Sequence, residues 1–176
     1  YGLISDGFKN ELNKTASLID ELQEEIQADA EKMTNHLFGK IPIIYACDGY
    51  KGMAVRFTQQ LAENSKMLSW HNIIPEMNHN ELVGWRTKNE NLAVIFFRNE
   101  TDHKRNQKRI EINNEVVSKY TSSVMEYWSK GDSMIEKTFY LINVCDHVSF
   151  NLSKRNNVIV EEIEVINYLK GELAKF

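Results

Sequence analysis

The run Ile41-Pro42-Ile43-Ile44-Tyr45-Ala46 decides the fold class, because it is short, apolar and rich in residues that favour strands. A second run of this kind is Leu92-Ala93-Val94-Ile95-Phe96-Phe97. Neither run alternates between apolar and polar residues, which is typical of strands buried on both faces in a parallel sheet covered by helices. Weaker strand candidates lie over residues 67–73 and 123–128.

A long helix is expected before the first strand. Apolar residues recur there at steps of three or four, which predicts a helix over residues 6–38. Ser5 and Asp6 are candidate caps at its start. Gly39 and Pro42 are expected to end it, because glycine tolerates a left-handed backbone and proline refuses a helical one.

Further helices are expected between and after the strands. Their apolar stripes fall over residues 50–64, over 104–120, from Met134 to Cys145 after a cap at Asp132, and from Ile159 to Leu173. Strands and helices therefore alternate along the chain. This order predicts an α/β fold, a three-layer sandwich with a mostly parallel sheet of four or five strands covered by helices.

Composition excludes several classes of protein. The 176 residues are 42% hydrophobic and carry a formal net charge of −4, so no nucleic-acid partner is expected. No apolar run is long enough for a membrane span, and no signal peptide is visible. Cys47 and Cys145 stand far apart, which fits neither a metal motif nor a disulfide framework and favours a reducing, cytoplasmic location. The chain begins at Tyr1 without Met, and we interpret it as a piece of something longer.

Ligands of parallel sheets bind beyond the carboxyl ends of the strands, which directs attention to three segments. These are residues 47–50, 75–85 and 98–103. The second segment places His79 between two Asn and two Glu residues, and a histidine titrates near neutral pH and can serve as acid or base. The alternative is a surface loop with an ordinary histidine. No second His or Cys stands at ligand spacing, so no metal site is expected.

Two other polar segments invite a functional interpretation. Glu63 lies in the polar segment Gln59–Lys66. If its carboxylate were partly buried, its pKa would rise toward the range that a general base needs. The default interpretation is a carboxylate at a solvated helix end. The basic stretch Arg98–Arg109 follows a strand and opens a helix, so it either binds phosphate or forms a plain solvated helix face. Glycine-rich phosphate loops and the GxSxG nucleophile motif are absent.

Several segments together resemble a known family. They are Ile41-Pro42-Ile43-Ile44-Tyr45, Ala54-Val55-Arg56-Phe57, Glu63-Asn64-Ser65-Lys66, Pro75-Glu76-Met77-Asn78-His79-Asn80-Glu81 with Gly84-Trp85, Asp102-His103 with Arg105, Arg109-Ile110-Glu111 and Tyr168-Leu169-Lys170. Nearly the full chain resembles the C-terminal sugar-isomerase (SIS) domain, flavodoxin-like in fold, of the bacterial and archaeal bifunctional phosphoglucose/phosphomannose isomerases. The segment QQLAENSK is also similar to QQL…ESNGK around the catalytic glutamate of conventional phosphoglucose isomerases.

The resemblance implies a mechanism and a set of site residues. Glucose 6-phosphate or mannose 6-phosphate would be converted to fructose 6-phosphate through a cis-enediol, a step of glycolysis and gluconeogenesis. Glu63 would carry the proton between C2 and C1, His79 would assist ring opening in the partner subunit's site, and Lys170 would lie near the ring oxygen. Substrate contacts are expected, by the same resemblance and from their positions, at Asp48, Gly49, Arg56 and Asn80. No cofactor and no metal are expected.

The resemblance also implies partners. Residues 1–176 would form one SIS domain, the C-terminal half of a two-domain isomerase, with the helix over 6–38 leading into it. The N-terminal SIS domain, which holds the loop that grips the sugar phosphate, has no match here, so the isolated chain is expected to be inactive.

A homodimer is expected, with Val83 and Trp85 near the interface. The alternative is a non-catalytic SIS domain that binds carbohydrate derivatives as a sensor or scaffold; a flavodoxin-like response module is disfavoured.

Overall fold

The structure, a computed structural model, describes residues 6–176. Its elements in chain order are α1 (Gly7–Glu21), α2 (Gln23–Leu37), β1 (Ile41–Cys47), the 3-10 turn η1 (Asp48–Tyr50), α3 (Lys51–Ser65), β2 (Trp70–Ile74), α4 (Glu76–His79), the 3-10 turn η2 (Glu81–Gly84), β3 (Leu92–Arg98), α5 (Lys104–Val117), β4 (Val124–Trp128), α6 (Met134–Arg155) and α7 (Glu164–Leu173). All four strands predicted from the sequence are present.

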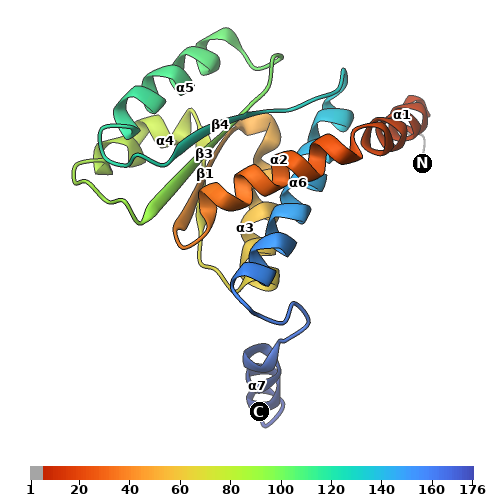
Figure 1. The fold of residues 1–176 in the computed structure, drawn as a ribbon, viewed down its shortest axis with the longest axis vertical. Coiled ribbons are helices and arrows are strands. Elements are labelled where there is room, and N and C mark those ends of the chain that lie inside the picture. The colour runs from red at the N-terminus through yellow and green to blue at the C-terminus, as the bar shows by residue number, and fades with distance from the viewer. Residues whose placement is uncertain (1–5) are drawn as a thin grey trace.

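The four strands form one parallel sheet in the order β2-β1-β3-β4. Helices α2, α3 and α6 cover one face, and α4 and α5 cover the other (Figure 1). Successive residues of β1 point to opposite faces: Ile44 and Ala46 pack under α3 and α6, whereas Ile43 and Tyr45 pack under α4 and α5. This double burial explains why β1 and β3 are continuous apolar runs and confirms the predicted three-layer α/β sandwich.

The first helix is two helices. At Leu22 the backbone leaves helical geometry (φ −98°, ψ 10°), so the expected helix over 6–38 is divided into α1 and α2. The predicted stripe is buried from Ile26 to Leu37, where α2 covers the sheet, but Leu12 stays 41% exposed on α1. Asp6 precedes α1 without capping it through its side chain and pairs with Lys9 instead, while Ser5 lies outside the described residues.

The start of α6 also differs from the expectation. Its cap is Ser133 and not Asp132: the Ser133 hydroxyl accepts a hydrogen bond from the Glu136 backbone N–H, and the Glu136 carboxylate accepts one from the Ser133 N–H. Gly131 makes this box possible. It has φ +113°, and a Cβ there would lie 2.5 Å from the Glu136 Cβ.

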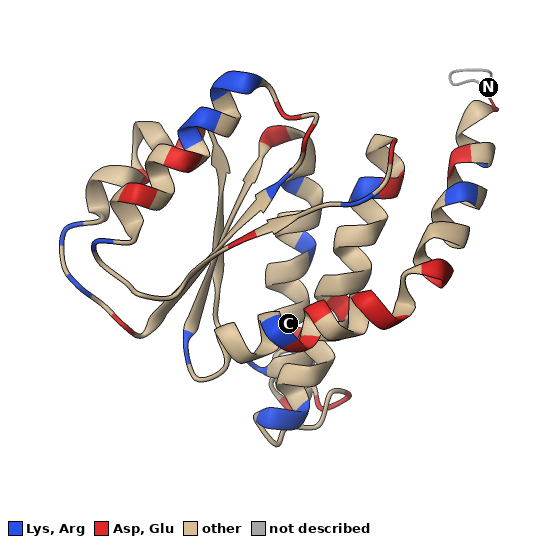
Figure 2. Ribbon diagram, turned by 45° about the horizontal axis from the view of Figure 1, so that its top comes forward, with Lys and Arg blue, Asp and Glu red and all other residues tan. Residues whose placement is uncertain are grey.

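Charged residues are spread over the helices without a large field of one sign (Figure 2). The acidic run Asp20–Glu25 lies at the junction of α1 and α2, and its Asp and Glu residues are exposed. Within residues 6–176, no helix is long and apolar enough to cross a membrane.

His36 is expected to make the stability of the domain depend on pH. Its ring Nε2 lies 3.1 Å from the carbonyl oxygen of Val94, and burial lowers the His36 pKa below its ordinary value of 6.5 although this hydrogen bond opposes the shift. A lowered folded-state pKa means that the unfolded chain binds the proton better. We therefore expect the free energy of unfolding to fall as pH drops below about 6.5. In denaturant titrations at several pH values, His36→Gln should weaken that dependence; an unchanged dependence would contradict this account.

Candidate active site

The carboxyl edge of the sheet carries one group of the predicted residues. Asp48 begins η1 directly after β1 and lines a cavity of about 520 Å³, together with Lys51 and Glu76. Gly49 follows in the same turn. Asn80 stands at the end of α4 and donates a 2.7 Å hydrogen bond to the Glu76 carboxylate. Asp48, Gly49 and Asn80 therefore share one edge, where the sheet topology predicts ligands.

His79 is the last residue of α4 at this same edge, and its side chain is exposed. Glu63 lies elsewhere. It is near the end of α3, which runs back from the carboxyl end of β1 to the opposite edge before β2 begins. The five residues of β2 alone span roughly 15 Å between these edges. Within one chain, the structure does not bring Glu63 and His79 together.

The segment Glu63-Asn64-Ser65-Lys66 is held to α6 through Asn64 and Ser65. The Asn64 amide donates to the Ser149 hydroxyl at 2.9 Å, and the Ser65 hydroxyl donates to the Ser149 carbonyl at 2.7 Å. Asn156, at the end of α6, donates to the Ser65 carbonyl at 2.9 Å. These bonds fix the backbone of the segment. Within the part of the chain that the structure describes, no donor forms a hydrogen bond to the Glu63 carboxylate.

Glu63 is exposed near the end of α3, as the default interpretation of a solvated helix end has it, and it borders the start of the C-terminal helix. A cavity of about 240 Å³ is lined by Ala62 and Glu63 from α3 and by Ile163 and Ile166 from the start of α7. Lys170 stands further along α7 and is exposed. The structure therefore places Glu63 beside the helix that carries Lys170, although the two residues are 107 positions apart in the sequence (170 − 63).

Arg56 lies on α3 two helical turns before Glu63, on the same face of the helix. Its guanidinium donates both hydrogen bonds to the Asp146 carboxylate of α6, at 2.9 and 3.2 Å. Both bonds come from one guanidinium nitrogen, and they tie α3 to α6 next to the Ser149 contacts. A role of Arg56 in substrate binding stays a prediction, and in this structure its charge is matched by Asp146.

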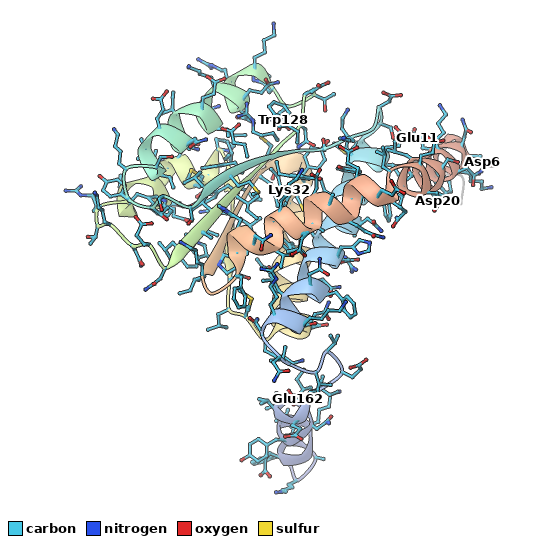
Figure 3. The ribbon with its side chains drawn as sticks, viewed as in Figure 1. Asp6, Glu11, Asp20, Lys32, Trp128 and Glu162 are labelled. Atoms are coloured by element: carbon cyan, nitrogen blue, oxygen red, sulfur yellow. The ribbon has the colours of Figure 1, made fainter. Side chains whose placement is uncertain are left out.

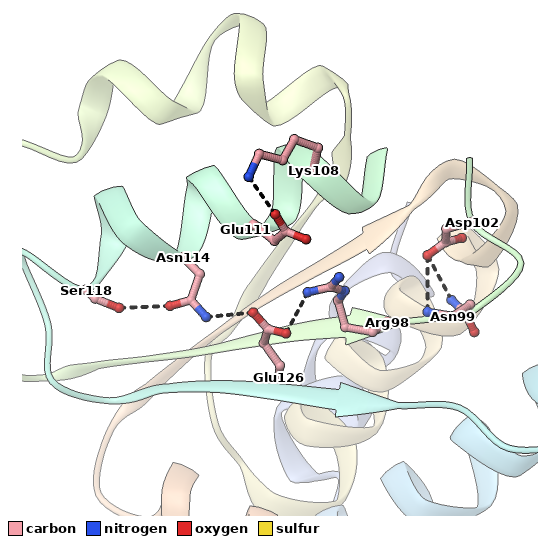
Figure 4. Close-up of polar contacts among 8 residues, drawn as sticks. All are labelled: Arg98, Asn99, Asp102, Lys108, Glu111, Asn114, Ser118 and Glu126. Atoms are coloured by element: carbon pink, nitrogen blue, oxygen red, sulfur yellow. Dashed lines mark hydrogen bonds and ion pairs between the residues drawn. The ribbon is translucent and has the colours of Figure 1, made fainter. Parts of the chain in front are cut away.

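The basic stretch Arg98–Arg109, which begins at the last residue of β3, makes its contacts within the domain. Arg98 is 4% exposed, and its guanidinium donates to the Glu126 carboxylate at 2.6 Å and lies 4.6 Å from the centre of the Trp128 ring. Figure 4 shows this network continuing from Glu126 to Asn114. At the start of α5, the His103 ring accepts a hydrogen bond from the Arg105 backbone N–H. The helix terminus is thus capped by its own chain, as the solvated-face interpretation requires.

The polar cluster over residues 75–85 contains a structural carboxylate. Glu81 accepts hydrogen bonds from the Tyr45 hydroxyl at 2.5 Å, the Asn72 amide at 2.6 Å and the Trp70 indole at 3.0 Å. Burial and the Glu81 carboxylate raise the pKa of Tyr45 well above its usual range. Trp85, expected near an interface, is instead only 8% exposed and donates to the Tyr45 hydroxyl, whereas Val83 is 71% exposed.

Glu81→Ala should therefore destabilise the domain. The change leaves the buried Tyr45 hydroxyl without its acceptor, which costs about 1–3 kcal/mol. The measurement is the midpoint of urea unfolding. Glu81→Gln is the matched control, because it keeps an acceptor oxygen and should lose less stability. Equal stability of the wild-type and Glu81→Ala proteins would show that the network is not stabilising.

Across residues 6–176, no three His, Cys, Asp or Glu side chains gather to hold a metal ion. Cys47 and Cys145 are both buried and free, and burial raises the pKa of Cys47 to about 12. Neither thiol is therefore a ready nucleophile at neutral pH. The predicted catalytic residues Glu63, His79 and Lys170 are a carboxylate, an imidazole and a lysine, groups that transfer protons and stabilise charge.

Comparison with known proteins gives several relatives that are bifunctional phosphoglucose/phosphomannose isomerases. The chain is 29% identical to the bifunctional phosphoglucose/phosphomannose isomerase of Caldicellulosiruptor bescii and 28% identical to that of Aquifex aeolicus. The matches cover 94% and 95% of this chain but 52% and 53% of those proteins, so the chain spans about half the length of these curated relatives.

The fold is shared more widely. The C-terminal domain of glucosamine-fructose-6-phosphate aminotransferase from Francisella tularensis superposes with a TM-score of 0.65 at 14% identity, covering 89% of this chain and 47% of that one. Residues 26–173 match the family model described as the bacterial phospho-glucose isomerase C-terminal SIS domain. This match confirms the resemblance carried by the segments from Ile41 to Lys170. The chain belongs to the family of bacterial phosphoglucose isomerase C-terminal SIS domains.

Proposed function

We propose that this chain is the C-terminal half of an aldose–ketose isomerase that converts glucose 6-phosphate or mannose 6-phosphate to fructose 6-phosphate. The observation that carries the proposal is the exposed Glu63 carboxylate, which accepts no hydrogen bond within the described residues and lines a cavity beside the start of the helix that bears Lys170. A carboxylate can abstract the proton beside a carbonyl, and a cation carried by the neighbouring helix can stabilise the charge that develops. The names of the two bacterial relatives support this substrate class.

In the proposed reaction the sugar ring first opens. The Glu63 carboxylate takes the proton from C2 of the open-chain aldose, the electron pair of that C–H bond forms the C1–C2 double bond, and the C1 carbonyl oxygen takes up a proton to give the cis-enediol. Glu63 then returns its proton to C1, and the C2 hydroxyl loses its proton as C2 becomes the ketone, so that the proton gained by the C1 oxygen is balanced by the one lost from the C2 oxygen. Lys170 stabilises negative charge that develops on the sugar oxygens. The reverse path regenerates the aldose.

The positions of His79 and Glu63 favour a site shared between subunits. Because these residues lie at opposite edges of one sheet, His79 serves ring opening in the site of a second copy. A homodimer of the full-length protein is therefore part of the proposal. The proposal has two further parts. Residues 1–176 form a single C-terminal SIS domain, and an N-terminal domain outside this chain binds the phosphate.

The direct test is to supply the full-length protein with each hexose 6-phosphate and to measure fructose 6-phosphate. Conversion of either aldose supports the proposal. Binding of the sugar phosphates without any conversion would overturn it and favour the sensor or scaffold alternative.

A further inference from the structure

Lys66 ends α3 in a backbone conformation that lysine rarely adopts. Its φ of +56° and ψ of +36° are left-handed, and the N–H of the next residue, Met67, bonds to the Leu61 carbonyl. Glycine is the usual residue at this position of a helix end, because a side chain with a Cβ atom strains a left-handed backbone. The contacts of the Lys66 side chain therefore bear on the reason that a lysine occupies this position.

The Lys66 ammonium binds three backbone carbonyl oxygens. They belong to Glu63 at 2.6 Å, Val160 at 3.1 Å and Glu162 at 2.8 Å. An ammonium has three N–H donors, so all of them are used. One carbonyl belongs to the residue that carries the proposed base, and the other two belong to the connection between α6 and α7.

The contact continues from Glu162 into α7. The Glu162 carboxylate accepts a 2.5 Å hydrogen bond from the backbone N–H of Glu164, the first residue of α7. Figure 3 labels Glu162 at this connection, and Figure 1 shows α7 projecting from the body of the domain. None of the α7 residues is buried. Lys66 is therefore a main attachment of α7 beside Glu63.

We propose that Lys66 is a positioning residue that sets the orientation of α7, and so of Lys170, relative to the Glu63 carboxylate. This inference rests on the proposed function. Lys170 lies six residues after the start of α7, roughly 9 Å along the helix axis. A tilt of about 10° at the attachment would move it by roughly 1.5 Å, and a misplacement of about 1 Å can cost about 100-fold in rate.

The test uses the full-length protein with Lys66 replaced by Met, Gly and Arg. Lys66→Met keeps the aliphatic stem but removes the charge and the donors. We expect kcat to fall about 10- to 100-fold with KM little changed. Lys66→Arg should recover part of the loss, because its guanidinium still donates to carbonyl oxygens. Lys40→Met is the matched control, since the Lys40 ammonium also donates to a loop carbonyl, that of Glu90, but away from Glu63.

Lys66→Gly separates positioning from stability. Glycine relieves the left-handed backbone, so the melting temperature should hold or rise while kcat falls as it does in Lys66→Met. Hydrogen exchange of residues 158–173, measured without substrate, should be faster in both variants and unchanged in Lys40→Met.

Two results would overturn the inference: wild-type kcat in Lys66→Met, or a lowered kcat with wild-type exchange in α7. Failure of the proposed function looks different, because the wild-type protein would then show no turnover while the exchange measurement would still report on the attachment of α7.

Discussion

Replacing Glu63 with Gln in the full-length protein is expected to lower isomerase kcat by at least about 100- to 10,000-fold. The amide has nearly the same size and keeps a hydrogen-bonding oxygen, but it cannot accept a proton at neutral pH. Without a base no enediol forms, so the loss should appear in kcat. Binding of the sugar phosphate, measured by calorimetry, should change little, because the proposal assigns phosphate binding to the N-terminal domain outside this chain.

The fold around Glu63 makes this variant a clean test. Its neighbours Asn64 and Ser65 hold the backbone to Ser149, and the Glu63 carboxylate takes part in none of these bonds. The variant should therefore unfold at the wild-type temperature. Glu115→Gln is a suitable control, because Glu115 is an exposed carboxylate of α5 on the other face of the sheet. A Glu63→Gln protein with wild-type kcat would exclude Glu63 as the base.

The second large effect concerns the isolated chain of residues 1–176. It should fold, because two apolar layers pack on both faces of its sheet, yet it should show no turnover of glucose 6-phosphate or mannose 6-phosphate. Binding energy at the non-reacting phosphate normally supports the chemical step, so its loss lowers the rate as well as the affinity. Circular dichroism and a cooperative thermal transition would establish that the chain is folded in the assay.

The matched comparison is the full-length protein assayed under the same conditions. We expect turnover in that protein and none above background in the isolated chain. Robust conversion by residues 1–176 alone would contradict the two-domain proposal, since it would place phosphate binding and chemistry within this domain.

The layers of the fold could be predicted from the sequence because β1 and β3 are buried on both faces. Such strands must be apolar at every position, and their runs stand out from the helical periodicity around them. The prediction was wrong at the bend of Leu22 and at the cap of α6. Both features depend on contacts that form only in the folded chain. The bend arises because α2 covers the sheet and α1 does not, and the cap is decided by the hydrogen bonds between Ser133 and Glu136 in place of Asp132.

The candidate site was less predictable. Glu63 and His79 stood out as polar candidates, but their catalytic roles came from the resemblance. The weak strand candidate over residues 67–73, which becomes β2, was the one sign in the sequence that the two residues lie at opposite edges of the sheet. Lys66 was not selected at all, because its partners Val160 and Glu162 lie more than 90 residues away in the sequence. The one local signal is that α3 ends without a glycine, at a lysine. In the same way, Glu81 looks like any loop carboxylate until the fold brings Tyr45 and Trp70 to it.

Hydrogen exchange at C2 of the substrate in heavy water tests the central claim most directly, because it follows the proton that Glu63 is proposed to carry. The full-length wild-type protein should incorporate deuterium at C2 of the hexose 6-phosphate as the enediol forms and returns. The Glu63→Gln protein should bind the same substrate and incorporate none above background. Exchange at the wild-type rate in Glu63→Gln would contradict the account, since the proton would then move through another group.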